Sequence, residues 1–138
     1  MTTDSSESVP DDATAPFWAG LREGVLDLPR CRSCAELVWY PRSQCPRCMS
    51  ADLSWERLSG RGTVYSFTVN RRGQGAYRGR PPFVLAYVEL EEGPRVMSHV
   101  VGVDPEEVRV GVPVRLSDRR PDGEEAAPDL LRFEPAVR

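Results

Sequence analysis

Apolar and polar residues alternate along the second half of the chain in a pattern typical of short β-strands. The segment Thr63–Asn70 places Tyr65, Phe67 and Val69 on one predicted face, with hydroxyl and amide side chains on the other. Phe83–Leu90 is almost wholly apolar, as expected of a central strand. Three further strands are predicted at Arg95–Val103, Pro113–Ser117 and Leu130–Glu134.

The connections between these strands favour a barrel. A long loop follows the first strand, and Asp104-Pro-Glu-Glu, after the third, combines a capping aspartate with a proline, which fits one helical turn. Five strands with these two connections describe an OB-type barrel. The pattern favours this barrel only weakly over a five-stranded sandwich fragment. We assign residues 61–138 to this domain.

The N-terminal part of the chain predicts a disordered segment followed by one short helix. Residues 1–13 are acidic and polar, with too little apolar surface to offset the entropy of ordering. A helix is predicted over 14–24, with Asp12 or Thr14 as its cap, Pro16 in its first turn and Gly24 at its end. Its apolar side chains must dock, either on this protein's own domain or on a partner subunit: Phe17, Trp18 and Leu21.

Residues 25–60 contain all four cysteines, as Cys31-Arg-Ser-Cys34 and Cys45-Pro-Arg-Cys48, between short β segments at 26–30 and 37–40. Two such knuckles, ten residues apart, place four thiolates tetrahedrally around one zinc ion. Iron in a rubredoxin-like site uses the same ligands, so spacing does not separate the two metals. Two disulfides or a thioredoxin-like redox pair are further alternatives. Four protein ligands leave no open coordination position, so the metal is expected to be structural.

Composition narrows the possible chemistry. All 18 basic residues are arginine, which excludes lysine Schiff-base chemistry and a Walker-type phosphate loop. His99 is the single histidine, and it lies in an apolar run, so it is either a structural residue or a general base. The net charge is -3, and the chain has neither a long apolar stretch nor a secretory signal, so we expect a cytoplasmic protein.

The first loop of the predicted barrel is rich in arginine and glycine. No acidic residue occurs between 70 and 82, and OB domains commonly contact ligands at this loop. Guanidinium groups bind phosphate oxygens in bidentate fashion, so a phosphate-bearing ligand is one interpretation. Two other interpretations stay open, a solvated or partner-contacting loop and single-stranded nucleic acid. The candidate contact residues are Arg71, Arg72, Tyr77, Arg78 and Arg80.

Several runs together resemble a known family. They begin at Leu28-Pro-Arg-Cys-Arg-Ser-Cys, Trp39-Tyr-Pro-Arg-Ser-Gln-Cys-Pro-Arg-Cys and Ser59-Gly-Arg-Gly-Thr-Val-Tyr. They continue at Pro82-Phe-Val-Leu-Ala-Tyr-Val-Glu-Leu, Gly93-Pro-Arg-Val-Met-Ser-His and Gly111-Val-Pro-Val-Arg-Leu. The combination resembles the zinc-ribbon/OB-fold acyl-CoA-associated family, called domain of unknown function thirty-five. Two residues depart from the family pattern, Ala35 where a glycine is common and His99 where a small polar residue is common.

The resemblance implies a mainly β protein with a short N-terminal helix, a rubredoxin-like zinc ribbon and a five-stranded OB barrel. It also implies a non-catalytic accessory subunit of a thiolase-superfamily partner, either a thiolase or a steroid side-chain aldolase. The partner would act on lipid, sterol or polyketide thioesters, with a CoA thioester at the interface between the subunits. The alternative function is a single-stranded nucleic-acid-binding protein.

Overall fold

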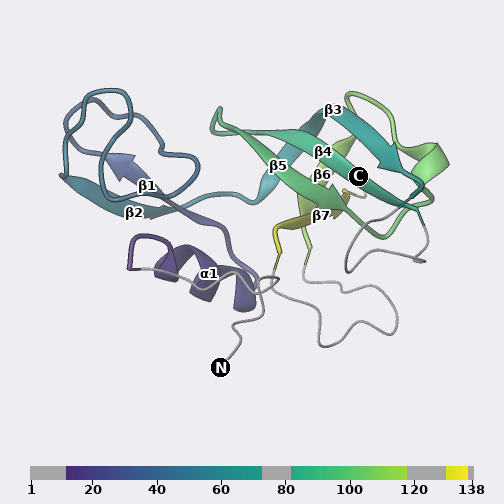
Figure 1. Ribbon diagram of the computed structural model, residues 1–138, viewed down its shortest axis with the longest axis horizontal. Coiled ribbons are helices and arrows are strands. Elements are labelled where there is room, and N and C mark those ends of the chain that lie inside the picture. The colour runs from purple at the N-terminus through teal and green to yellow at the C-terminus, as the bar shows by residue number, and fades with distance from the viewer. Residues whose placement is uncertain (1–11, 73–81, 118–129, 137–138) are drawn as a thin grey trace.

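A computed structural model describes residues 12–72, 82–117 and 130–136 of the chain. A helix and a two-stranded ribbon form one end of the molecule, and a closed barrel forms the other (Figure 1). The first part contains α1 (Ala15–Arg22), β1 (Asp27–Cys31) and β2 (Leu53–Arg57). The barrel contains β3 (Arg61–Asn70), β4 (Phe83–Leu90), β5 (Arg95–Val100), the 3-10 turn η2 (Pro105–Glu107), β6 (Pro113–Leu116) and β7 (Arg132–Pro135).

Helix α1 begins and ends close to where the sequence predicts. Thr14 occupies the N-cap position, but its side chain makes no capping hydrogen bond, so the expected side-chain cap is not formed. At the other end Gly24 has φ +81°. Its N–H donates to the Leu21 carbonyl at 3.1 Å and the N–H of Val25 donates to the Gly20 carbonyl at 2.9 Å. These two bonds form a Schellman motif, which ends the helix at a left-handed glycine.

The ribbon differs from the sequence prediction in the partner of its first strand. Strand β1 pairs antiparallel with β2, from Asp27 opposite Arg57 to Cys31 opposite Leu53. The predicted β segment at 37–40 is wrong as a strand, because only Leu37 forms a bridge, with Arg30. The residues between them turn through the first cysteine knuckle, so the chain returns beside β1 only briefly before the second knuckle.

The barrel has the closed strand order β3-β4-β5-β7-β6, which confirms the OB-type prediction over the sandwich. Its pairs are antiparallel except for β5 and β7, which run parallel with His99 opposite Arg132. The predicted helical turn is present as η2, where the Asp104 side chain accepts a hydrogen bond from the N–H of Glu106 at 2.9 Å.

A β-bulge in β3 corrects the predicted faces of this strand. The register against β4 shifts between Val64 and Ser66, so Tyr65 has no direct partner. One inserted residue reverses the alternation of the side chains that precede it. As a result Val64 is buried in the barrel and Tyr65 is 48% exposed, although the sequence placed Tyr65 with Phe67 and Val69. Phe67 and Val69 do pack against the core, as predicted.

The helix, ribbon and barrel share one apolar core. Phe17 of α1 and Leu28 of β1 belong to the same buried cluster as Val64, Val88 and Phe133 of the barrel. Burial of such side chains contributes roughly 1.5–3 kcal/mol each. The shared core therefore holds the ribbon against the barrel.

Candidate metal centre

Two turns of the same construction present the four cysteines. In the first, the N–H of Ala35 donates to the Cys31 carbonyl at 2.8 Å, and in the second, the N–H of Met49 donates to the Cys45 carbonyl at 2.8 Å. Each turn ends with a left-handed residue, since Ala35 and Met49 both have φ +66°. Left-handed geometry is unfavourable for residues with a Cβ, so the turns are strained at Ala35, where the family commonly has a glycine, and at Met49.

The four sulfur atoms lie close enough to bind one ion. They are all within 4.8 Å of one another. The Sγ atoms of Cys31 and Cys48 are 3.5 Å apart, and those of Cys34 and Cys45 are 3.6 Å apart. Tetrahedral zinc with Zn–S bonds of about 2.3 Å requires sulfur separations of about 3.8 Å, so the set fits a four-coordinate metal. No disulfide links the four cysteines, and Cys31 and Cys45 are fully buried.

Backbone amides of the knuckles lower the pKa of two of the thiols, which favours the thiolate form that binds metal. A hydrogen bond from the backbone of Cys34 lowers the pKa of Cys31 to about 6, and the backbone of Cys48 lowers the pKa of Cys45. The backbone of Glu36 acts in the same direction on Cys34, but burial and the Cys45 thiol outweigh it and raise the pKa of Cys34 to about 12. The pKa is raised in the second cysteine of each knuckle, Cys34 and Cys48, and both thiols would have to lose their protons to bind a metal ion.

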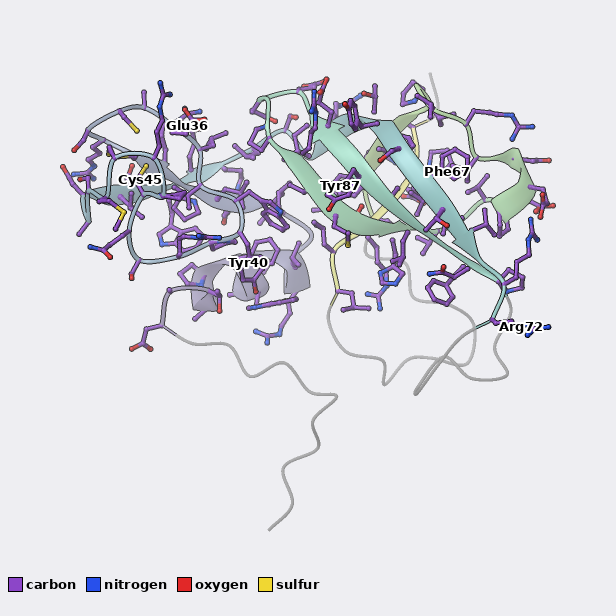
Figure 2. All side chains as sticks on the ribbon, turned by 45° about the horizontal axis from the view of Figure 1, so that its top comes forward. Glu36, Tyr40, Cys45, Phe67, Arg72 and Tyr87 are labelled. Atoms are coloured by element: carbon purple, nitrogen blue, oxygen red, sulfur yellow. The ribbon has the colours of Figure 1, made fainter. Side chains whose placement is uncertain are left out.

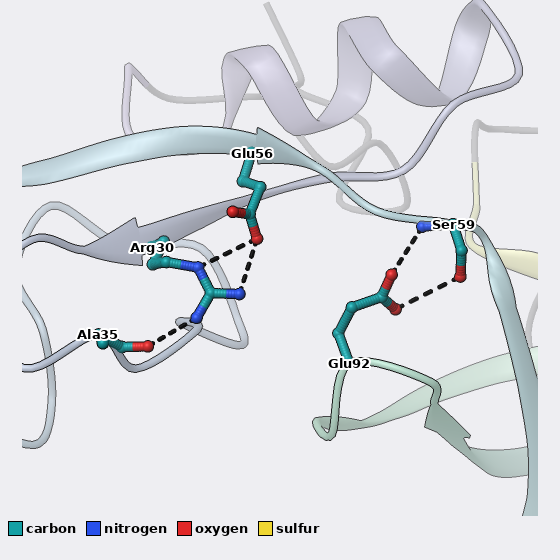
Figure 3. Close-up of polar contacts among 5 residues, drawn as sticks. All are labelled: Arg30, Ala35, Glu56, Ser59 and Glu92. Carbon is teal, nitrogen blue, oxygen red and sulfur yellow. Dashed lines mark hydrogen bonds and ion pairs between the residues drawn. The ribbon is translucent and has the colours of Figure 1, made fainter.

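Arg30, which the sequence reasoning did not select, ties the first knuckle to the ribbon (Figure 3). Its Nη1 donates to the Ala35 carbonyl at 2.6 Å, and its Nε and Nη2 donate to Glu56 of β2 at 3.0 and 2.7 Å. This side-chain hydrogen bond from Arg30 lowers the pKa of Glu56. Such outer contacts orient the loops that carry metal ligands. The sequence signal was an arginine next to Cys31, whose partner is only evident once β1 and β2 are paired.

A second contact joins the linker after the ribbon to the barrel. The Glu92 carboxylate, in the turn between β4 and β5, accepts hydrogen bonds from the Ser59 N–H at 2.8 Å and the Ser59 hydroxyl at 3.5 Å (Figure 3). Beside this contact lies an open cleft of about 480 Å³ between the ribbon and the β4–β5 turn. Its lining includes Leu37, Trp39 and Arg95. The cleft is thus built by both domains.

The residues predicted to contact a ligand or a partner differ in their burial. Phe17 is 1% exposed and its ring packs edge-on against Trp18, Trp39 and Tyr40 at centroid distances of 5.0, 5.6 and 5.9 Å. The structure thus packs Phe17 on the protein's own domain, and Trp18 is half-buried beside it.

The arginine-rich loop is described only at its start. Arg71 forms an ion pair with Glu106 of η2, and Arg72 is exposed. Tyr77, Arg78 and Arg80 lie outside the described residues. Whether the loop binds phosphate therefore stays a prediction.

His99 is half-buried on β5, with its ring centroid 5.8 Å from that of Phe83. Burial, together with the charge of Arg132, lowers its pKa and keeps the ring neutral at pH 7. Packing against an aromatic ring agrees with a structural histidine.

No helix among the described residues is long and apolar enough to span a membrane.

Two family models match consecutive parts of the chain. Residues 18–54 match "ChsH2, rubredoxin-like zinc ribbon domain", and residues 55–117 match "ChsH2, C-terminal OB-fold domain". The structure is also similar to the solved "Ltp2-ChsH2(DUF35) aldolase", with a TM-score of 0.77 and 32% identity over 95% of this chain and 100% of that one. The chain belongs to the DUF35 family. Both the fold and the four-cysteine ribbon expected from the resemblance are confirmed.

Two curated relatives are named as enzyme subunits. The "Probable enoyl-CoA hydratase alpha subunit" of Thermomonospora curvata is 36% identical over 88% of this chain and 37% of its own length. The "Benzoylsuccinyl-CoA thiolase subunit BbsA" of Thauera aromatica is 31% identical over 67% of this chain and 58% of its own length. The chain spans less than two thirds of the length of either relative.

Proposed function

We propose that this DUF35 protein is a non-catalytic accessory subunit that binds, completes and stabilises a thiolase-superfamily partner. The partner, a thiolase or retro-aldolase, would carry out the reaction on an acyl-CoA thioester of lipid, sterol or polyketide metabolism. The observation that carries the proposal is the likeness in fold and sequence to the Ltp2-ChsH2 aldolase, across all of the matched chain.

The metal site supports a structural rather than a catalytic role. Four cysteine ligands complete a tetrahedral shell, so a bound zinc ion has no position for water or substrate. All four thiols are committed to it, which leaves no cysteine as a nucleophile. Chemistry on a thioester would therefore come from the partner.

The names of the relatives support the substrate class. A hydratase subunit and a thiolase subunit both have CoA thioesters in their names. We propose that the loop from Arg71 to Arg80 contacts CoA phosphates at the interface with the partner, because guanidinium groups bind such oxygens in bidentate fashion. The ion pair between Arg71 and Glu106 would hold the start of this loop against η2.

Co-expression with thiolase-superfamily proteins from the same organism tests the proposal. The pair is expected to co-purify and to cleave or form an acyl-CoA thioester, whereas the isolated DUF35 chain shows no turnover. Changing Arg78 and Arg80 together to alanine should weaken CoA binding in a salt-sensitive manner, with the exposed Arg22, on α1, changed to alanine as the matched control. Turnover by the purified chain alone would contradict the accessory role.

Binding of single-stranded nucleic acid is the alternative function, and a separate titration tests it. The bulge does expose Tyr65 on the barrel, yet the guanidinium of Arg95 lies 3.9 Å from the centre of its ring. That contact occupies a ring face on which a base would stack. Titration with a fluorescent oligonucleotide is expected to show no binding, and sub-micromolar binding would favour the alternative.

A further inference from the structure

The outer face of the barrel over β3, β4 and β5 exposes large apolar side chains. Tyr65, Tyr87 and Met97 are 48%, 44% and 50% exposed. Tyr87 and Met97 are direct partners across the β4–β5 pair, and Tyr87 lies opposite Ser66, next to the bulge that turns Tyr65 outward (Figure 2 labels Tyr87). We call these three residues, with the hollow beside Tyr87 and Met97, the β3–β5 face.

The hollow in this face is apolar and small. It has a volume of about 240 Å³, and its lining includes Leu85, Tyr87 and Met97 together with Ser66 and Thr68. Small-molecule sites generally measure about 300–1,000 Å³, so this one is below their range. A side chain that projects from another protein fits such a hollow, and anchoring of this kind dominates the binding energy of many interfaces.

Arg95 decides which class of macromolecule suits the face. Its guanidinium carbon lies 3.9 Å from the Tyr65 ring centroid, and its Nε donates to Glu89 at 3.0 Å. The charge is therefore already paired, and the tyrosine ring is partly covered. Both features disfavour a nucleic acid, which needs free cations and open rings. Tyrosine, methionine and arginine held in place are residue types enriched at protein interfaces.

The β3–β5 face continues into the cleft between the ribbon and the barrel. Arg95 lines that cleft together with Trp39 and also packs on Tyr65. The exposed parts of the two tyrosines amount to roughly 200 Å², since such side chains have about 150–250 Å² each. A stable interface needs about 800 Å² per partner. The face alone is too small for a stable interface, so its occupant must also cover neighbouring surface, and the cleft beside Arg95 adjoins it. The likeness to the Ltp2-ChsH2 aldolase makes a different subunit, rather than a second copy, the occupant that we argue for.

We propose that the β3–β5 face is the surface on which the partner subunit docks. The partner inserts an apolar side chain into the hollow beside Tyr87 and Met97 and extends across Arg95 into the ribbon–barrel cleft. This inference rests on the proposed function, because it specifies where the partner of that function binds.

Affinity measurements with the full chain test this surface. The immobilised chain is exposed to purified thiolase-superfamily proteins from its own organism, and the Kd of the binding protein is compared among variants. Met97→Asp and Tyr87→Ala should each weaken binding at least about 30-fold, as expected of residues at the centre of an interface. Val110→Asp is the matched control, because Val110 is 66% exposed and lies in the β5–β6 connection. It should change the Kd less than about twofold.

The outcomes separate this inference from the proposed function. Binding of the wild type that survives both Met97→Asp and Tyr87→Ala overturns the docking surface and leaves the accessory role intact. Failure of the wild type to bind any of these proteins overturns both. If light scattering shows a dimer of the chain that Met97→Asp dissociates, the face belongs to a second copy and the docking of a partner is overturned. Oligonucleotide binding that Tyr87→Ala abolishes would also overturn the docking of a partner protein. Circular dichroism confirms that each variant is folded.

Discussion

The left-handed residues of the two cysteine knuckles predict that glycine substitutions stabilise the protein. Ala35 and Met49 both have φ +66°, a conformation that costs a residue with a Cβ roughly 1–2 kcal/mol. Ala35 is exposed and Met49 is 63% exposed, so removing either side chain loses little buried area. Glycine adds roughly 0.5–1 kcal/mol of unfolded-state entropy, which offsets part of the gain. Each of Ala35→Gly and Met49→Gly should therefore raise the free energy of unfolding by about 0.5–1 kcal/mol.

Urea unfolding followed by circular dichroism measures this gain. Free zinc must be buffered at one concentration for all variants, because a bound metal adds stability in proportion to the logarithm of its concentration. Gly24→Ala is the matched control with the opposite sign. Gly24 also has a left-handed φ, +81°, and an added Cβ would meet no atom within 4 Å, so only the backbone conformation is tested.

We expect Gly24→Ala to lower the free energy of unfolding by about 1 kcal/mol. If Ala35→Gly and Met49→Gly also lower it, the reasoning from backbone conformation is refuted for the knuckles. A loss confined to Met49→Gly would instead mean that the exposed methionine makes a stabilising contact. Zinc content per chain should be unchanged in all three variants, which elemental analysis checks.

Four further predictions follow from the structure. Cys45→Ser should release close to one metal ion per chain and unfold the ribbon, because structural zinc contributes about 10–16 kcal/mol in small peptides. Elemental analysis measures this loss of metal and shows whether the ion is zinc or iron. Gly62→Ala should destabilise by about 1–3 kcal/mol in urea unfolding, since its Cβ would lie 2.5 Å from the Glu89 carbonyl oxygen. Glu92→Ala should lose about 1 kcal/mol by removing the contact with Ser59, whereas Glu91→Ala, at an exposed neighbour, should lose little. Because the pKa of His99 is lowered in the folded protein, the unfolded chain takes up the proton at higher pH, and the free energy of unfolding should fall as pH drops below about 6.5. His99→Gln should reduce this dependence of the free energy of unfolding on pH, which unfolding measured at several pH values checks.

Much of the fold was predictable because its signals are local. The four cysteines, the capping aspartate of η2 and the apolar run of β4 each determine structure within a few residues. Pairing between distant segments was not predictable in the same way. The register shift in β3 depends on β4, and the partner of β1 is a strand that begins 22 residues after β1 ends.

The candidate site shows the same division. The metal ligands were found from spacing alone, and the structure brings their sulfur atoms together. Arg30 and Glu92 were missed, because their partners Glu56 and Ser59 lie 26 and 33 residues away in sequence. The exposure of Tyr65 was missed because strict alternation was assumed through a strand that contains a bulge.

The position of β7 sets the order in which the two domains are completed during synthesis. All four metal ligands and both strands of the ribbon are present once Arg57 has been made, so a metal ion can bind the ribbon before the barrel is complete. The barrel closes only when β7, which ends at Pro135, pairs with β5 and β6. At about 5–20 residues per second, synthesis of the chain from Arg57 to Pro135 takes roughly 4–16 s. During that interval the metal-bound ribbon is attached to an open sheet, whose unpaired edges are vulnerable to mispairing until the last strand arrives.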